Sequence, residues 1–476
     1  MSKALGIINF SGNHIWVKGL QSYRPIGAMS FLGRYRVIDF PLSNMSNSGI
    51  DQIQVYINQK PRSLTEHIGT GRHYNINSKR GKVRILFSEN GIENSIYDNE
   101  IAAYIENIEC IENTPCPYVI IAPSYMVYSM NFDSLLQSHI DSEADITLLY
   151  HSVDNAKDHF LNCDLLNLNR QKGVLSIEKN RGNAKNRNIF MDTYVMKKEL
   201  FIDLIKKGHD MSSMYTLPQV INIECSELDI RGVSHRGFFA AITDLKSYYE
   251  ANLSLLDFKS AFSLFDDNWP IYTKTTDSCP TQYFETANVK TSFVSNGCLI
   301  EGTVENSVIG RGCMIKKGAV VRNTVLLPGA YVGEDVHVEN QVVDNTESSN
   351  PITGEVSGVD KEFQEKVVGD LAVVSTDQNK SDRSKSDDKS DKKSDKDKDK
   401  SKSEKESSDD KKDSSESGEK GKGDSGKKDA DKADKDKKSK KLSAEDFKAL
   451  AAFFGVMILS GVVVYLIKKK NGNKQK

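Results

Sequence analysis

The sequence lacks an excess of charge of either sign. Its 476 residues include 64 Lys and Arg and 66 Asp and Glu, which gives a formal net charge of −2 at pH 7. A protein that binds nucleic acid typically carries a clear basic excess, because contacts with phosphates supply most of its affinity. The balance of charges therefore argues against a dedicated nucleic-acid binder.

Cysteine is also sparse, with seven residues in the whole chain. The number is odd, and the spacings match no zinc-binding pattern. We expect reduced thiols of a cytosolic protein, most of them buried as small apolar side chains, and no metal site built on them. The cysteines are Cys110, Cys116, Cys163, Cys225, Cys279, Cys298 and Cys313.

Apolar residues make up only 38% of the chain and aromatic residues 8%. Residues 380–441 explain much of this deficit, because their 62 positions hold 23 Lys or Arg and 19 Asp or Glu, and most of the others are Ser or Gly. Such a segment cannot bury enough apolar surface to offset its chain entropy, so we predict a disordered, solvated spacer. About 345 of the residues before it have the composition of an ordinary globular protein, enough for a large core.

Long hydrophobic runs are absent from the N-terminus, where Met1 to Phe10 is too short for a signal peptide and predicts a buried strand instead. One long run lies near the other end. Residues 449–467 carry no charge and are followed by Lys468, Lys469 and Lys470. As a helix, this run would extend about 28 Å, which matches the hydrocarbon thickness of a bilayer. We expect a single transmembrane helix anchoring a cytoplasmic globular part to the cell membrane.

The first 255 residues alternate apolar, strand-like runs with helical segments. Residues 52–57, 118–122 and 145–150 have the composition of buried strands, and residues 99–111 and 131–139 that of helices. This alternation predicts an α/β domain of the Rossmann-like type with a mainly parallel sheet.

Residues 256–345 predict a second domain. From about residue 295, apolar residues recur every six positions, which is typical of a hexapeptide-repeat β-helix of about three coils. The positions are Val308, Met314, Val320, Leu326, Val332 and Val338. Residues 346–441 would then be a connector and linker, and residues 442–476 the anchor.

The segment 33–50, from Gly33-Arg-Tyr-Arg to Ser-Gly-Ile50, closely resembles a block of the ADP-glucose pyrophosphorylase (glucose-1-phosphate adenylyltransferase) family. Residues 249–252 and 269–274 extend the resemblance, which covers about residues 3–345. It implies a nucleotidyltransferase domain followed by a left-handed parallel β-helix. It also implies a reaction of glucose 1-phosphate with ATP that releases pyrophosphate and supplies ADP-glucose for glycogen synthesis.

Four positions at which the catalytic members of that family carry charged groups are replaced in this chain. Counting without gaps, Trp16 stands at the family's catalytic Arg and Ile26 at its Lys. Tyr125 and Ala241 stand at its two metal-binding Asp residues. A phenol and a methyl group cannot hold Mg²⁺, which prefers carboxylate oxygen. We therefore expect no catalytic residues and no metal site in this chain.

Other positions keep the family's residue type. The resemblance implies an adenine contact for Gln59, a sugar-phosphate contact for Glu178 and Lys179, and proximity to an effector site for Arg36. These residues predict that the chain could still bind a nucleotide, a sugar phosphate or an effector.

The pattern is similar to the GlgD-type regulatory subunit of this family. It implies a catalytically weak or inactive chain that activates a catalytic partner in a hetero-oligomer, expected to be a tetramer, with Mg²⁺ at the partner's site. Two alternatives remain open. One is an active adenylyltransferase with a site rearranged around Arg24, Asp98 or Asp244, and the other is an interaction protein that tethers a glycogen-synthesising complex to the membrane.

Overall fold

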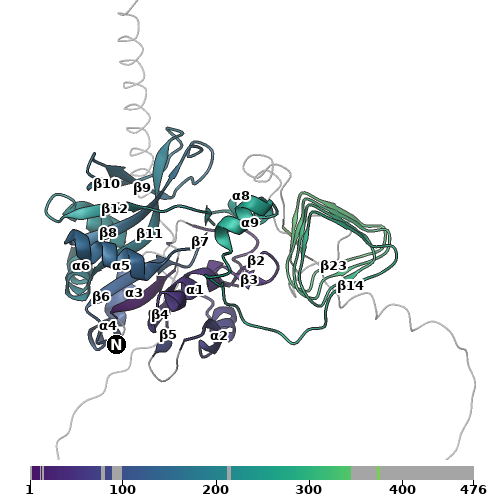
Figure 1. The fold of residues 1–476 in the computed structure, drawn as a ribbon, viewed down its shortest axis with the longest axis horizontal. Coiled ribbons are helices and arrows are strands. Elements are labelled where there is room, and N and C mark those ends of the chain that lie inside the picture. The colour runs from purple at the N-terminus through teal and green to yellow at the C-terminus, as the bar shows by residue number, and fades with distance from the viewer. Residues whose placement is uncertain are drawn as a thin grey trace, which may run out of the picture. The chain divides into compact units, whose positions relative to one another are not determined.

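The computed structural model describes residues 3–10, 12, 15–76, 81–87, 99–211 and 216–344, together with the backbone of residues 373–375. These residues form an N-terminal α/β region and a region of stacked parallel strands (Figure 1).

A mixed β-sheet forms the centre of the N-terminal region. Its main path runs in the order β10-β9-β11-β6-β1-β4-β5, and β8 pairs with both β11 and β12. The strands are β1 (Ala4–Asn9), β4 (Gln52–Ile57), β5 (Lys82–Phe87), β6 (Tyr118–Pro123), β8 (Ile146–Val153), β9 (Asp164–Leu168), β10 (Val174–Lys179), β11 (Arg187–Lys197) and β12 (Ile230–Ser234).

Only part of this sheet is parallel. Strands β5, β4, β1 and β6 are parallel neighbours, whereas β11 runs antiparallel to β6, β8 and β9. The expectation of a mainly parallel sheet therefore holds for one half. The other half differs because β11 enters between β6 and β8 in the opposite direction.

Helices and loops cover both faces of the sheet. Strand β1 alternates between them, since Ala4 and Ile8 join one buried cluster and Leu5 and Ile7 join the other. The helices are α1 (Asp39–Asn47), α2 (Arg62–Ile68), α3 (Glu100–Glu106), α4 (Ile108–Glu112), α5 (Phe132–Ser142), α6 (Lys198–Met211), α7 (Leu217–Glu224), α8 (Leu245–Ser254) and α9 (Phe258–Leu264).

The predicted helix over residues 99–111 is two short helices, α3 and α4, which meet at Asn107. The prediction for 131–139 is confirmed by α5. Both α3 and α5 begin at an asparagine whose side chain accepts a hydrogen bond three residues on: Asn99 from Ala102 N, and Asn131 from Ser134 N, each 3.0 Å. These N-caps explain where the two helices start.

The second region is a parallel β-helix, as the six-residue repeat predicts. Its coils have a triangular cross-section (Figure 1). Two of its three sheets contain four strands and the third contains five, because β26 (Val373–Ser375) pairs with β25. The complete coils in the described residues number four rather than the expected three. The strands are β14 (Gln282–Tyr283), β15 (Asn288–Lys290), β16 (Phe293–Val294), β17 (Leu299–Ile300), β18 (Thr303–Glu305), β19 (Val308–Ile309), β20 (Met314–Ile315), β21 (Val320–Arg322), β22 (Val325–Leu326), β23 (Tyr331–Val332), β24 (His337–Glu339) and β25 (Val342–Asp344).

The phase of the repeat differs from the strict period of six. The residues that fill the inside of the β-helix are Ile309, Ile315, Val321, Leu326, Val332, Val338 and Val343. The spacing shortens to five after Val321, because a complete coil contains 17 residues in this part of the chain. Met314 and Val320, which were expected inside, are only partly buried, and Val308 packs in the core of the N-terminal region instead.

Several contacts join the β-helix to the N-terminal region. The tip of the hairpin formed by β2 (Ser30–Phe31) and β3 (Tyr35–Arg36) contacts the β-helix at Gly33, where an added Cβ would lie 2.5 Å from the carbonyl oxygen of Ile309. The Tyr249 hydroxyl donates a 2.6 Å hydrogen bond to the Asn323 carbonyl oxygen. Arg24 forms an ion pair with Asp344 at the end of β25.

The structure corrects the expectation of a transmembrane helix. Across the described parts of the chain, no helix is both long and apolar enough to cross a bilayer. The longest of them, α6, has 14 residues and would extend only about 21 Å, less than a bilayer core requires. The predicted span over 449–467 and the charged segment 380–441 lie outside the described residues.

Candidate functional site

The candidate site lies where the parallel strands β6, β1 and β4 end side by side. In open α/β sheets, ligands bind beyond the carboxyl ends of the strands where neighbouring connections diverge. A small cavity of about 90 Å³ occupies this position. Among the residues that line it are Trp16, Ile26, Gln59, Lys60 and Ser124, which follow these three strands.

Lys60 contacts the segment that follows β1 at three residues. The Lys60 ammonium lies 5.6 Å from the centroid of the Trp16 ring, at cation–π distance, and donates hydrogen bonds to the carbonyl oxygens of Gln21 (3.2 Å) and Ser22 (2.6 Å). Trp16 is 49% exposed. An aromatic ring in contact with a lysine therefore lines the cavity at the position where the family resemblance places a catalytic arginine.

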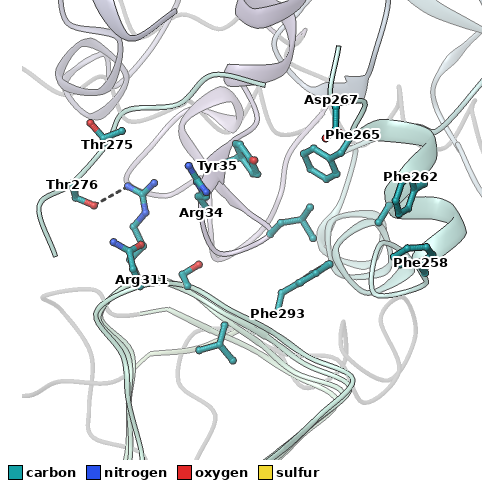
Figure 2. A pocket seen from close by; sticks show the side chains of 15 residues that line it. Arg34, Tyr35, Phe258, Phe262, Phe265, Asp267, Thr275, Thr276, Phe293 and Arg311 are labelled. Carbon is teal, nitrogen blue, oxygen red and sulfur yellow. Dashed lines mark hydrogen bonds between the residues drawn. The ribbon is translucent and has the colours of Figure 1, made fainter. Parts of the chain in front are cut away.

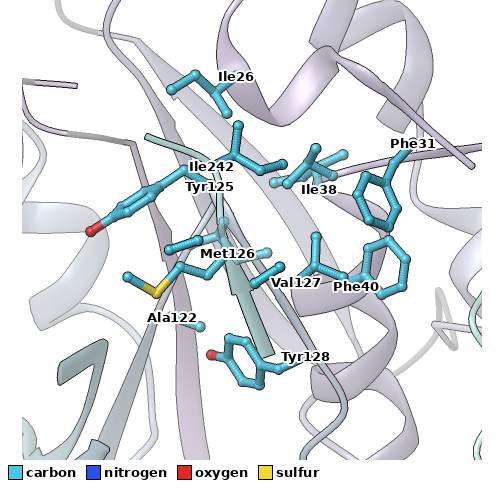
Figure 3. Packing of buried hydrophobic residues seen from close by; sticks show 14 of the residues in the cluster. Ile26, Phe31, Ile38, Phe40, Ala122, Tyr125, Met126, Val127, Tyr128 and Ile242 are labelled. Atoms are coloured by element: carbon cyan, nitrogen blue, oxygen red, sulfur yellow. The ribbon is translucent and has the colours of Figure 1, made fainter. Parts of the chain in front are cut away.

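Ile26, Tyr125 and Ala241 lie in one continuous hydrophobic core. Ile26 is in a short 3-10 helix, η1 (Ile26–Ala28), and is buried. Tyr125 precedes β7 (Met126–Tyr128), which pairs with β13 (Phe239–Ala241), and the Ile242 amide donates to the Tyr125 carbonyl oxygen at 2.9 Å. Figure 3 shows Ile26, Tyr125 and Ile242 packed among Met126, Val127 and Ile38. Apolar packing thus occupies three of the four replaced positions.

The phenol of Tyr125 is hydrogen-bonded to a half-buried carboxylate. Its hydroxyl donates to Asp192 Oδ2 at 3.1 Å, and the Tyr194 hydroxyl donates to Asp192 Oδ1 at 2.6 Å. Burial raises the pKa of Asp192, and the bond from Tyr194 lowers it. Asp192 has a φ of 47° where the pairing of β11 with β8 shifts register between Phe190 and Tyr194.

This arrangement does not fit Mg²⁺. The carboxylate nearest to Tyr125 already accepts from two phenols, and Ala241 offers no oxygen from its side chain. Within the residues described by the structure, no group of three or more His, Cys, Asp or Glu side chains is arranged to hold a metal ion. We therefore derive no step of a reaction through a metal bound to this chain.

Of the two predicted sugar-phosphate residues, Lys179 acts on the charge of Asp192. Glu178 and Lys179 are exposed at the end of β10, and Lys179 Nζ lies 3.0 Å from Asp164 Oδ2. Burial raises the pKa of Asp164, and Lys179 lowers it. The positive charge of Lys179 also acts on Asp192. The structure thus brings Lys179 close to Tyr125 through two carboxylates, whereas Gln59 lines the separate cavity beside Trp16.

Arg36 lies outside that cavity. Its Nη1 donates to the Ser63 carbonyl oxygen at 2.7 Å, and its backbone amide donates to Asp39 Oδ2 at 2.8 Å. Burial lowers the pKa of its guanidinium. Its role in effector binding stays a prediction.

Two of the three residues of the rearranged-site hypothesis, Arg24 and Asp244, each have a separate structural partner. Arg24 is paired with Asp344 of the β-helix, and Asp244 caps α8 by accepting a 2.7 Å hydrogen bond from Ser247 N. Asp98 lies outside the described residues.

Sequence reasoning missed Lys60, Asp192 and Asp344. Each contacts a residue that is distant in the chain, so no local sequence pattern predicts the contact. The backbone of Asp192 is in the left-handed region, and no pattern in a single sequence predicts that conformation for an aspartate at this position.

Two family models match the chain. Residues 19–212 match "Nucleotidyl transferase", and residues 279–368 match "GlmU-like, C-terminal hexapeptide". A glucose-1-phosphate adenylyltransferase of Clostridium perfringens strain 13 is 32% identical over 316 residues, which cover 64% of this chain and 78% of that protein. The chain belongs to the glucose-1-phosphate adenylyltransferase family.

Other adenylyltransferases of the family match over a similar extent. The protein of Fervidobacterium nodosum is 30% identical over 351 residues, which cover 72% of this chain and 83% of that protein. The protein of Bacillus mycoides is 28% identical over 326 residues, which cover 66% of this chain and 85% of that protein. The sequence similarity thus extends over most of these relatives' length.

Proposed function

We propose that this chain is a regulatory, catalytically weak or inactive subunit of a glucose-1-phosphate adenylyltransferase. It would assemble with a catalytic chain that converts ATP and glucose 1-phosphate to ADP-glucose and pyrophosphate for glycogen synthesis. The folded part would work in the cytoplasm, where its seven free thiols would stay reduced.

One observation carries this proposal: Ile26, Tyr125 and Ala241 belong to a single buried hydrophobic cluster. Nucleotidyl transfer builds negative charge on phosphates, and enzymes stabilise that charge with cations and metal ions. Removing a single such stabiliser commonly costs about 10²-fold or more in rate. These packed side chains offer no cation and no carboxylate metal ligand that could stabilise the charge on the phosphates.

Activation of the partner requires a difference in contact energy. A regulatory subunit favours the active state of a catalytic chain only if it binds that state more tightly than the inactive one. The reaction would then run in the partner's site with the partner's Mg²⁺, and the present chain would act through the surface they share.

The test is a measurement of ADP-glucose formation by the full chain alone, by the catalytic chain alone and by the two mixed. We expect no Mg²⁺-dependent turnover by the full chain alone, and a higher rate or lower KM in the mixture than for the catalytic chain alone. A Tyr125→Phe variant is the matched control, because it removes only the hydroxyl bonded to Asp192.

The proposal predicts that the control stays inactive alone and activates the partner as the unmodified chain does. Robust turnover by the unmodified chain alone would contradict the proposal. A mixture no faster than the catalytic chain, with no complex seen in sedimentation, would contradict the partnership.

A further inference from the structure

The three sheets of the β-helix present three different outer faces (Figure 1). The sheet of β16, β19, β22 and β25 packs on the N-terminal region, because Val308, Val325 and Val342 on its outer side belong to the buried cluster of that region. Figure 2 shows Phe293 of the same sheet pointing away from the β-helix toward Phe262 of α9. This first face is therefore occupied within the chain.

The sheet of β15, β18, β21 and β24 has a charged outer face. Glu305 lies 3.6 Å from Lys290 and 3.0 Å from Arg322, which belong to the neighbouring coils. The side chains of Lys290 and Arg322 are 64% and 50% exposed. Exposed ion pairs of this kind contribute little to stability and are satisfied by water, so this second face needs no partner.

The sheet of β14, β17, β20 and β23 forms a third face with an apolar centre. Its residues Ile300, Ile315 and Val332 fill the inside, so the residues between them point outward. Two outer rows follow, and each row contains one residue from every coil in the order of the coils. The first row is Gln282, Leu299, Met314 and Tyr331, and the second row is Phe284, Glu301, Lys316 and Gly333.

Two copies of the third face are complementary to each other. A second copy turned over about an axis parallel to the strands presents its coils in reverse order, so the second coil of one copy faces the third coil of the other. Leu299 would then lie opposite Met314 of the second copy, and Glu301 would lie opposite its Lys316. Each of these contacts would occur twice, as in any interface between identical copies related by a two-fold axis.

The charges at the centre of such a pair would alternate in sign. Within one chain, Lys316 Nζ lies 3.3 Å from Glu301 Oε1, and the two side chains are 33% and 25% exposed. Both side chains therefore keep part of their surface for a further contact. With a second copy in place, each carboxylate would have an ammonium group of its own chain and one of the other chain beside it, and no like charges would lie face to face.

The outer coils of the third face match in shape. Phe284 of the first coil is 39% exposed, and it would lie opposite Gly333 in the fourth coil of the second copy. The space inside one chain does not require a glycine at this position, because an added Cβ would meet Val336 Cγ2 at an ordinary distance of 3.5 Å. The missing side chain of Gly333 would leave room for the phenyl ring of the other copy.

We propose that the third face joins two copies of this chain in a symmetric dimer. Leu299 and Met314 would form its apolar centre, with Glu301 and Lys316 beside them. The face spans four coils only, so the interface is smaller than that of a permanent dimer, and we expect a dissociation constant on the order of micromolar. The proposal does not depend on the regulatory function, because it concerns contact between copies of this chain alone.

The experiment is sedimentation equilibrium of the full chain, of two charge-reversal variants and of their mixture. Lys316→Glu places four carboxylates at the centre of the dimer, and Glu301→Lys places four ammonium groups there. Each variant alone should dimerise about tenfold or more weakly than the unmodified chain. The equimolar mixture should recover the original affinity, because every carboxylate of one variant then faces an ammonium group of the other.

Recovery in the mixture can come only from contact between chains, since neither variant keeps the ion pair within its own chain. Lys290→Glu is the matched control, because it makes the same reversal on the charged second face, and it should change the affinity by less than about twofold. Gly333→Leu should weaken the dimer by about tenfold without lowering Tm, since the added side chain fills the space opposite Phe284 of the other copy.

Three outcomes would overturn the proposal. The first is an unmodified chain that stays monomeric at about 100 μM. The second is a Lys316→Glu variant that dimerises as the unmodified chain or the Lys290→Glu control does. The third is a mixture of the two charge-reversal variants that associates no better than either variant alone.

Discussion

At the scale of single residues, Glu100 is the carboxyl group whose pKa is raised most among the residues that the structure describes. It is buried, and its two oxygens accept hydrogen bonds from Asn9 Nδ2 (2.8 Å) and from the Leu217 amide (2.7 Å). Burial raises its pKa to about 8, and the negative charge of Asp192 contributes. Asn9 Oδ1 is buried without a hydrogen-bond partner in the described residues, and exchanging the oxygen and nitrogen of that amide would let it accept from a protonated Glu100.

Stability should therefore fall as the pH rises. The pKa of Glu100 is higher in the folded chain than in the unfolded chain, so folding takes up a proton at pH values between the two. The contribution of Glu100 is fully present below about pH 4.5 and is lost as the pH rises through about 8. Between pH 5 and 8 this loss is on the order of 3 kcal/mol.

Glu100→Gln checks this prediction, because glutamine stays neutral at every pH. The difference in Tm between the variant and the unmodified chain should increase in favour of the variant from pH 5 to pH 8. Titrating groups that do not interact with Glu100, such as His235, whose pKa burial lowers, affect both proteins equally and cancel in the difference. A constant difference across that range would show that Glu100 is ionised in the folded chain.

At the scale of structural elements, the hairpin tip at Gly33 decides how β2 and β3 meet the β-helix. Gly33 has a φ of 68°, and an added Cβ would lie 2.5 Å from Ile309 O and 2.7 Å from Ser295 Oγ. Gly33→Ala should therefore lower the free energy of unfolding by about 2 kcal/mol or more, through both backbone strain and the clash. Urea denaturation measures this change.

Gly49 provides a matched control for that variant. It has a φ of 71°, and an added Cβ would have no atom within 4 Å. Gly49→Ala carries the backbone cost alone, about 1 kcal/mol. Equal losses in the two variants would show that the contact between hairpin and β-helix contributes nothing to stability.

Most elements could be predicted from the sequence because their signals are local. Strand β4 begins and ends as predicted, at Gln52 and Ile57, since the apolar run sets its length. The features that were not predicted depend on distant partners. The antiparallel direction of β11 depends on which strands it lies between. The inward position of Val321 rather than Val320 depends on the shortened corner in each 17-residue coil.

At the scale of the whole molecule, the pair of Arg24 and Asp344 links the segment beside the candidate site to the last described coil. The side chain of Asp344 is 3% exposed and that of Arg24 is 19% exposed. Asp344→Asn should lower the free energy of unfolding by about 2 kcal/mol, because it removes a charge-assisted hydrogen bond from a mostly buried pair.

Asp335→Asn is the control for this variant, since Asp335 is an exposed carboxylate on the same β-helix. It should change stability by less than about 0.5 kcal/mol. Thermal unfolding of both variants in the same buffer makes the comparison. If Asp344→Asn were no less stable than the control, the ion pair would not hold the two regions together.

The candidate site was only partly predictable at this scale. The family resemblance pointed to Trp16, Ile26, Tyr125 and Ala241 by counting along the chain. It could not show that Tyr125 is bonded to Asp192, because the two residues are 67 positions apart and meet only through the sheet. A cavity lined by Arg34 and Arg311 also arises from the meeting of two regions, which no local pattern describes.

The stacking of the β-helix fixes how this molecule can change in length. Thr303, Val320 and His337 are paired in register, and the backbone turns at Asn306, Asn323 and Asn340 repeat at the same interval of 17 residues. Adding or removing one whole coil keeps every inward side chain inward and moves the end of the stack by about 4.8 Å. A single-residue insertion within a strand would turn its inward side chains outward, whereas a corner accepts a change in length, since the coil from Asn288 to Thr303 has 15 residues. The distance from the first coil to Asp344, which pairs with Arg24, therefore changes in steps of one whole coil.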